Sequence, residues 1–372
     1  MTIHIGVPTL EQHGDGRVRI TTPVNSDPLW FESNTKLQAS AEAVAGLMLV
    51  PALEQGTSIV SDQPLDPVWL ANVSQLIDIF SAWWGYQPQP EMFSAGACES
   101  SDKVRPDGTG LCFSGGVDSF FSLLNEGADI THLVFAHGYD IPLSDQSRYE
   151  DFVQSFELIA AEFSRQPVII RTNLREHPVF IASSWEKTHG AALAALGHML
   201  SQEIRQLNIA SSFAGEHSGK PWGSSTETDR LWSAADMRFV HGDVSVSRLE
   251  KTLQIADDPL AQRYLRVCWQ NKDSDLNCSR CEKCLRTMVA LEVVGKLKDF
   301  SCFESGVDLP RAVAKIRRVN IGFLRDWAAC ADFSSDSALS KSIKGLVRRS
   351  KPDASGRLHR FLHRSRGHFI TD

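Results

Sequence analysis

Two short stretches of the 372-residue sequence hold residue types that chemistry often uses. Residues 113–119 read FSGGVDS and lie between a possible strand, GTGLCF, and the apolar run FFSLL. The second stretch is a C-x-x-C-x-x-C run formed by Cys278, Cys281 and Cys284, with Cys268 ten residues earlier. The chemistry of the first would be anion binding, and that of the second would be metal or redox chemistry.

The glycine-rich stretch has the composition of a loop that holds a phosphate. Gly115 and Gly116 let the backbone turn its N–H groups toward a ligand, and the following helix offers unpaired N–H groups and a positive dipole end. Ser114 and Ser119 add hydroxyl donors, and Asp118 suits a Mg²⁺ ion beside the phosphate. No Gly-Lys-Ser/Thr follows, so this is not a Walker A loop. The alternative is a strand-to-helix turn that happens to be rich in glycine.

The cysteine run supplies four soft ligands in one short segment, residues 268–284. Four thiolates suit a tetrahedral Zn²⁺ ion, whereas a redox C-x-x-C pair would need only two of them. Free core cysteines are the third interpretation. We expect a structural zinc site, because clustered cysteines in a cytosolic chain favour metal or catalysis over disulfides.

The order of apolar runs predicts an α/β domain that positions both stretches. From residue 110, the β-like runs GLCF, HLVFAHG, PVIIRTN, LNIASSF and RFVHGD alternate with helical patterns, for example at 147–165 and 186–206. This alternation predicts βαβ units and a doubly wound, mostly parallel sheet. Ligands of such sheets bind outside the carboxyl ends of the strands.

The first hundred residues have a different pattern and read as a small α+β domain. Three β-like runs precede a helical pattern at 37–53, and a second helix is predicted from Asp66 as cap and Pro67 in the first turn to Gly85 as stop. Residues 87–110 are rich in Pro, Ser, Gly and charge, which is typical of a linker.

The expected domains are therefore 1–100, the α/β domain with its zinc knuckle at 108–300, and a helical extension with a basic tail at 301–372. Residues 341–372 hold nine Lys or Arg and two Asp, a local net charge of +7. A solvated tail is favoured over an RNA-contacting one. The whole chain carries a formal charge of −7, which does not indicate attraction to nucleic acid or to anionic membrane.

The compartment expected from the sequence is the cytoplasm. The opening segment has no basic region followed by an apolar run, and no stretch approaches 18 uninterrupted apolar residues. We expect no membrane partner, and a homodimer is left open.

The six residues SGGVDS resemble the S-G-G-x-D-S signature of the PP-loop ATP pyrophosphatase superfamily. The resemblance implies a fold of the PP-loop, HUP-like kind, with ATP bound at the loop and split between its α and β phosphates. An adenylylated substrate forms, pyrophosphate leaves and a nucleophile displaces AMP. It also implies a cradle for pyrophosphate and Mg²⁺, with Asp118 catalytic, made by Ser114, Gly115, Gly116, Val117, Asp118 and Ser119.

The cysteine run is similar to the zinc site of 7-cyano-7-deazaguanine synthases, which also have one upstream Cys and an Arg soon after the run. Here the run is CSRCEKCLR with Arg286, and the two motifs stand in the family's order. The family's Gly-Gln and His after the second strand are replaced by HGYDIPL, so the acceptor substrate, small or nucleobase-like, stays open.

Three functions follow from this likeness. The first is a ligase that activates a carboxylate or amide oxygen as an adenylate for attack by nitrogen. The second is sulfur transfer that forms a thioamide or a thio-nucleobase. The third is a zinc-knuckle RNA-binding protein with a vestigial nucleotide site. The nitrogen ligase is favoured by the zinc pattern.

Further candidate residues lie at strand ends and in the segment before the cysteines. His137, Gly138 and Arg171 follow two of the predicted strands and are expected to contact the nucleotide. The segment VSRLEK resembles the family segment whose lysine reaches the nucleotide phosphates, so Lys251 is predicted to be catalytic. The expected substrate-binding residues are Asp140, His189, Asp229, Trp232 and Arg248. Plain turns, helix packing and a solvated helix face are the competing interpretations.

Overall fold

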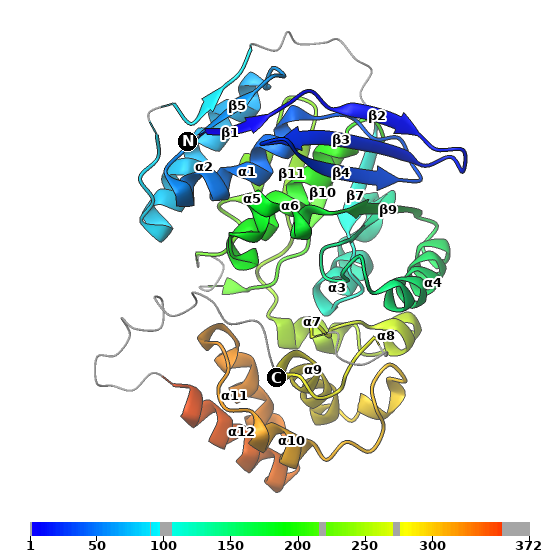
Figure 1. The fold of residues 1–372 in the computed structure, drawn as a ribbon. Coiled ribbons are helices and arrows are strands. Elements are labelled where there is room, and N and C mark those ends of the chain that lie inside the picture. Colours follow the sequence, from blue (N-terminus) through cyan, green and yellow to red (C-terminus); the bar gives the residue numbers. More distant parts are fainter. Residues whose placement is uncertain (1, 90, 97–105, 216–220, 271–275, 352–372) are drawn as a thin grey trace.

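The computed structural model describes residues 2–89, 91–96, 106–215, 221–270 and 276–351 (Figure 1). These residues form an eleven-stranded mixed sheet in the order β11-β10-β7-β8-β9-β4-β3-β1-β5-β6, with β2 paired to β3. The expected α/β class with a mostly parallel sheet is therefore confirmed.

The parallel part of the sheet is wound in both directions from its middle strand. The chain enters at β7, continues through β8 and β9 on one side, and then returns to place β10 and β11 on the other side. The carboxyl ends of β7 and β10 therefore border the place where the winding reverses, which is where such sheets bind ligands. The strands are β7 Gly108–Cys112, β8 His132–His137, β9 Gln166–Thr172, β10 Ile204–Ile209 and β11 Arg238–His241.

Helices cover both faces of the sheet and bury two hydrophobic cores. One core lies under α1 Ala41–Gln55, α2 Pro67–Trp84 and α6 Trp185–Met199. The other lies under α3 Val117–Asn125, α4 Gln146–Glu162, α7 Arg248–Gln254 and α9 Glu282–Val293. Alternate residues of a strand face opposite sides, so Leu133 and Val134 of β8 belong to different cores.

The N-terminal strands extend the same sheet. β4 pairs antiparallel with β9, and the Glu32 carboxylate, which is buried in this junction, lies 2.8 Å from Arg19 and 3.5 Å from Arg171. The sheet and one hydrophobic core are thus continuous between residues 1–100 and 108–300. The division into these two domains stays a prediction. The strands are β1 Thr2–Ile5, β2 Thr9–Gln12, β3 Val18–Val24, β4 Asp27–Ser33, β5 Ser58–Ser61 and β6 Phe93–Ser94.

The ends of two helices show where local sequence signals succeed and fail. In α2 the Asp66 carboxylate accepts from the Trp69 amide at 2.9 Å, and Gly85 ends the helix at φ 73°, as predicted. The helix expected over 186–206 is wrong in its last turns, because α6 ends at Met199 and β10 begins at Ile204. Ile204 pairs with Gly108 of β7, and this tertiary pairing overrides the local helical pattern.

The chain after residue 300 forms helices that pack at the end of the molecule farthest from β1 (Figure 1). They are α10 Leu309–Lys315, α11 Leu324–Phe333 and α12 Ser337–Ser350, with the short turn η6 Ile321–Phe323 between the first two. Most of the expected basic tail, residues 352–372, lies outside the described residues. Within the described ranges, no helix combines the length and apolarity needed to cross a membrane.

Short elements complete the connections. They are η1 Gly127–Asp129, η2 Leu174–Glu176, α5 Pro178–Ile181, η4 Asp229–Trp232, α8 Pro259–Tyr264 and η5 Leu297–Asp299.

Candidate functional site

The glycine-rich loop connects the central strand β7 to α3. Gly115 adopts φ +74°, and a Cβ there would lie 3.0 Å from the Phe152 ring, so other residues are disfavoured. Gly116 stands at the cap position of α3, and no side chain of the described residues caps this helix end. The first N–H groups of α3 are therefore left for water or a ligand.

A cavity of about 290 Å³ opens over this loop. Its walls come from the carboxyl ends of β7, β8 and β10, from α6 and from the segments around Arg248 and Lys283. The structure brings together in this wall seven of the expected residues, Ser114, Gly116, Asp118, Ser119, Asp140, His189 and Arg248. A second hollow, of about 340 Å³, lies near the amino end of β10 and contains none of them.

Asp118 and Arg248 form an ion pair across the cavity wall. The Arg248 Nη1 donates to Asp118 Oδ2, which joins α3 to α7 although 130 residues separate the two in sequence. Asp118 Oδ1 and Arg248 Nη2 are both buried, and neither has a hydrogen-bond partner within the described part of the chain. A buried carboxylate oxygen of this kind is a suitable hard ligand for Mg²⁺, and the free N–H suits a phosphate oxygen.

The other members of the signature differ in how they are placed. The Ser119 hydroxyl donates to the Gly116 carbonyl at 3.0 Å, so it must rotate to donate to a phosphate. Val117 is fully buried in the core beneath the loop, and it is not part of the cavity wall. The signature thus combines ligand-facing positions with one that anchors the helix.

His137 and Gly138 shape the loop after β8 and do not line the cavity. The His137 ring is buried, stacks on Tyr149 at 4.0 Å and donates from Nε2 to the Pro142 carbonyl at 3.0 Å. Gly138 adopts φ +105°, and a Cβ there would lie 2.0 Å from the Thr172 carbonyl oxygen. Both residues fix the backbone next to Asp140, which does line the cavity.

Arg171 and Trp232 also lie away from the cavity. Arg171 is paired with Glu32 in the junction between β4 and β9. Trp232 is buried against α1, where Gly46 leaves room for its ring, and its carbonyl accepts from His198 Nε2 at 2.9 Å. These two side chains join the N-terminal layer to the sheet.

Asp229 is fully buried next to the cavity and has its partners in the protein. Its Oδ2 accepts from the Ser224 hydroxyl at 2.7 Å and lies 2.7 Å from His241 Nδ1. Its Oδ1 accepts from the Ser225 amide at 3.3 Å. The carboxylate therefore orders the turn 224–229 and is not part of the cavity wall.

Lys251 is buried behind the cavity. Its ammonium donates to the carbonyls of Ser211 at 2.8 Å and Asp243 at 3.3 Å, and lies 5.2 Å from the Phe121 ring centre. Burial lowers the pKa of Lys251, and Asp118 and Glu126 oppose this shift. In this arrangement the lysine holds together the loops after β10 and β11, and contact with a phosphate would require both bonds to break.

His189 lines the aromatic half of the cavity. Its Nδ1 lies 3.0 Å from the Trp185 carbonyl, and its ring meets the edge of Trp222 at 5.5 Å between ring centres. Burial lowers the pKa of His189, so the ring is neutral at pH 7 and Nε2 is left as an acceptor.

Among the cavity-wall residues that sequence reasoning missed are Trp185, Trp222 and Lys283. Lys283 stands between Cys281 and Cys284, and a basic residue inside the cysteine run was the signal that could have revealed it. The two tryptophans have no such signal, because they belong to no recognisable motif and are brought together only by the fold.

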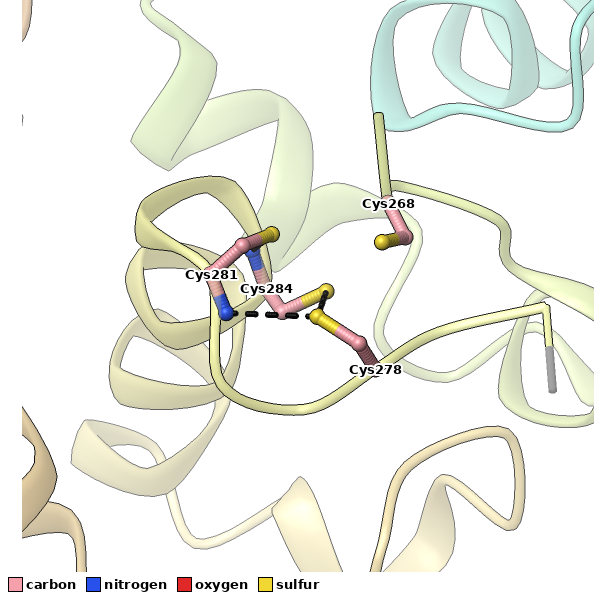
Figure 2. A group of neighbouring side chains, drawn as sticks. All are labelled: Cys268, Cys278, Cys281 and Cys284. Carbon is pink, nitrogen blue, oxygen red and sulfur yellow. Dashed lines mark hydrogen bonds between the residues drawn. The ribbon is translucent and has the colours of Figure 1, made fainter. Parts of the chain in front are cut away.

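The four cysteines converge on one buried cluster (Figure 2). All four Sγ atoms lie within 4.8 Å of one another, and Cys278 Sγ lies 3.9 Å from Cys284 Sγ. A tetrahedral ion with Zn–S bonds of about 2.3 Å places its sulfurs about 3.8 Å apart, which agrees with this spacing. The cluster could therefore bind a metal ion such as zinc.

Without a bound cation, two thiols of the cluster favour their protonated form. Hydrogen bonding to Cys268 raises the pKa of Cys281 to about 12 and raises that of Cys284 as well. A divalent ion reverses this preference, because it binds the deprotonated form. The amide of Cys281 donates to Cys278 Sγ at 3.3 Å and the amide of Cys284 donates to Cys281 Sγ at 3.4 Å, which favours thiolates at Cys278 and Cys281.

Comparison of the chain with family models, with characterised proteins and with solved structures gave no match. A functional assignment therefore rests on the two motifs and on the geometry of the cavity.

Proposed function

We propose that the protein is an ATP pyrophosphatase-type ligase of the PP-loop superfamily. It binds ATP at the loop after β7, splits it into AMP and pyrophosphate, and forms the adenylate of a carboxylate or amide oxygen for attack by nitrogen. The observation that carries this proposal is the position of SGGVDS. The signature lies at the carboxyl end of the central strand, where the winding of the sheet reverses and a cavity opens.

The loop has the means to stabilise charge on departing pyrophosphate. The uncapped beginning of α3 belongs to the same cavity wall as Arg248 and Lys283, so a helix dipole and two cations lie together there. Donors fixed before the reaction cost no reorganisation when negative charge moves to the leaving group. Asp118 Oδ1 would hold Mg²⁺, which neutralises phosphate charge when it is bound.

The other half of the cavity suits the acceptor and the nitrogen nucleophile. Tyr139, Trp185 and Trp222 give it apolar walls that exclude water, and His189 lies among them. An attacking ammonia or amine must lose a proton, and the neutral His189 Nε2 can accept it.

Nitrogen attack is favoured over sulfur transfer by the state of the cysteines. The four cluster cysteines lie together as a metal-ligand set, so none of them is free to carry sulfur while a metal is bound. Cys112 does line the cavity, but burial raises the pKa of its thiol, and Asp229 raises it further. A thiol kept neutral is a poor nucleophile.

The proposal is tested by incubating the protein with MgATP, ammonium and a panel of carboxylates and amides, and by identifying the products. We expect AMP and pyrophosphate, together with an amide when ammonia displaces AMP from an activated carboxylate, or a nitrile when an activated amide loses AMP and its N–H proton. Asp118→Asn keeps the shape and the bond to Arg248 but removes the charge, and should lower turnover by at least about 100-fold. Asp129→Asn, on the exposed turn after α3, is the matched control and should retain turnover. Release of ADP and phosphate, or full activity of Asp118→Asn, would contradict the proposal.

A further inference from the structure

The glycine-rich loop and the cysteine cluster are joined by one short segment, residues 265–268. The Arg266 amide donates to the Gly115 carbonyl at 2.7 Å, and a Cβ on Gly115 would lie 3.5 Å from Arg266 Cβ. Two residues later the chain reaches Cys268, the first member of the cluster. The cluster is thus attached directly to the backbone of the loop.

Asn277 fastens this segment to the cysteine run. Its side-chain oxygen accepts from the amides of Val267 at 2.8 Å and Cys268 at 3.2 Å, and its Nδ2 donates to the Leu265 carbonyl at 2.6 Å. Asn277 immediately precedes Cys278, so its side-chain amide ties the segment 265–268 to the beginning of the cysteine run.

Lys283 stands between two cysteines of the cluster and lines the cavity. It lies in the first turn of α9, which begins beside the cap residue Cys281, and its side chain lines the same wall as Asp118 and Arg248. Within the described residues no group hydrogen-bonds to its ammonium or pairs with it within 4 Å. By contrast, the buried Lys251 donates to two carbonyls and Lys187 is paired with Glu54.

The two cations of this wall, Arg248 and Lys283, differ in their charged partners. Arg248 is already paired with Asp118, which offsets much of its attraction for an anion. Lys283 has no ion pair within 4 Å among the described residues, although the more distant carboxylates of Asp140 and Asp118 also attract it, and it faces the same space. An unpaired half-buried cation is costly unless a ligand of opposite charge comes to it.

We propose that Lys283 binds the phosphate groups of the anion held by the loop, and that a metal at the four cysteines keeps this lysine in place. The inference rests on the proposed function for the identity of the anion. Because Cys281 and Cys284 flank Lys283 and both belong to the cluster, a metal bound there fixes the first turn of α9. Metal binding and phosphate binding then support each other, as linked equilibria must.

The first test measures the affinity for inorganic pyrophosphate with Mg²⁺ by calorimetry. Lys283→Gln should weaken binding by roughly 10-fold to 100-fold, the loss expected for one charge-assisted hydrogen bond. Arg280→Gln removes the same charge from the same cysteine run, but its side chain is exposed and lies 3.3 Å from Glu304, so it should bind as the wild type does. Equal affinities of all three proteins would overturn the proposal.

The second test measures zinc retained against a chelator with and without pyrophosphate. Added pyrophosphate should increase zinc retention more in the wild type and in Arg280→Gln than in Lys283→Gln. Only Lys283→Gln lacks the side chain that connects the phosphate site to the metal site. The same response in all three proteins would overturn the coupling.

A parallel titration with α,β-methylene-ATP separates the two proposals. If the wild type binds pyrophosphate but not the nucleotide, the ATP function fails while the Lys283 comparison stands. If Lys283→Gln matches the wild type for both ligands, the lysine proposal fails and the ATP function stands. A wild type that binds neither refutes both.

Discussion

Replacing Asn277 with alanine should separate the cysteine cluster from the glycine-rich loop. The Asn277 side chain is buried and makes four hydrogen bonds to main-chain groups. They reach the Val267 and Cys268 amides at 2.8 and 3.2 Å, and the Leu265 and Cys302 carbonyls at 2.6 and 3.1 Å. Alanine leaves all four groups without this partner.

The size of the effect follows from these contacts. Each buried polar group left unpaired costs about 1–3 kcal/mol, and such losses within one network do not add fully. We therefore expect Asn277→Ala to lower the free energy of unfolding by about 3–5 kcal/mol, a large share of the stability of an ordinary protein.

Urea unfolding followed by tryptophan fluorescence measures this change, with metal content determined in parallel. Asn320→Ala is the matched control, because Asn320 is exposed and its side chain makes one local bond, to the Gly322 amide. The control should lose less than about 1 kcal/mol. A loss that small in Asn277→Ala would refute the claim that this amide holds the segment 265–268 in place.

Two further predictions concern Gly138, which follows β8, and the buried His198. Gly138→Ala should destabilise the protein by at least about 2 kcal/mol in the same assay, because the backbone is at φ +105° and the new Cβ would meet the Thr172 carbonyl at 2.0 Å. Gly127→Ala meets nothing closer than 3.8 Å and should cost less than about 1 kcal/mol. Burial lowers the pKa of His198 to about 4, so the unfolded chain takes up this proton near pH 6.5 and the folded protein does so only near pH 4. Stability should therefore fall as pH drops through this window, by about 1.4 kcal/mol at pH 5.5 from His198 alone. His198→Gln should flatten the decline between pH 8 and pH 5.5, and an unchanged decline would contradict this assignment.

The parts of the site that sequence alone could predict are those encoded locally. The SGGVDS loop needs glycine at position 115, where φ is +74°, and Gly116 stands in extended conformation at an uncapped helix start. The cysteines converge because the C-x-x-C-x-x-C spacing places Cys281 and Cys284 at the beginning of one helix. The end signals of α2, Asp66 and Gly85, are equally local.

The rest depends on contacts between distant segments. Arg248 reaches Asp118 across 130 residues, and nothing in either local sequence specifies the other. Lys251 lies in a segment that resembles a family motif, yet its ammonium donates hydrogen bonds to two carbonyls behind the cavity. Trp232 was predicted to bind the substrate, but its side chain is buried in the core against α1.

The N-terminal segment illustrates the same limit at the level of architecture. Both of its helices and the strands β1, β3 and β4 could be predicted from their patterns, whereas β2, β5 and β6 were missed. The pairing of β4 with β9 could not be predicted, since strand partners are chosen by the tertiary fold. Glu32 contributes to this junction, because its buried carboxylate is paired with Arg171 of β9 as well as with Arg17 and Arg19.

A crystal structure of the protein with Mg²⁺ and α,β-methylene-ATP tests the central claim most directly. We expect the phosphates to lie against Gly115, Gly116 and the first turn of α3, with Asp118 toward the metal ion and Lys283 within hydrogen-bonding distance of a phosphate oxygen. A nucleotide bound elsewhere, or a cavity with no nucleotide at saturating concentration, would contradict it.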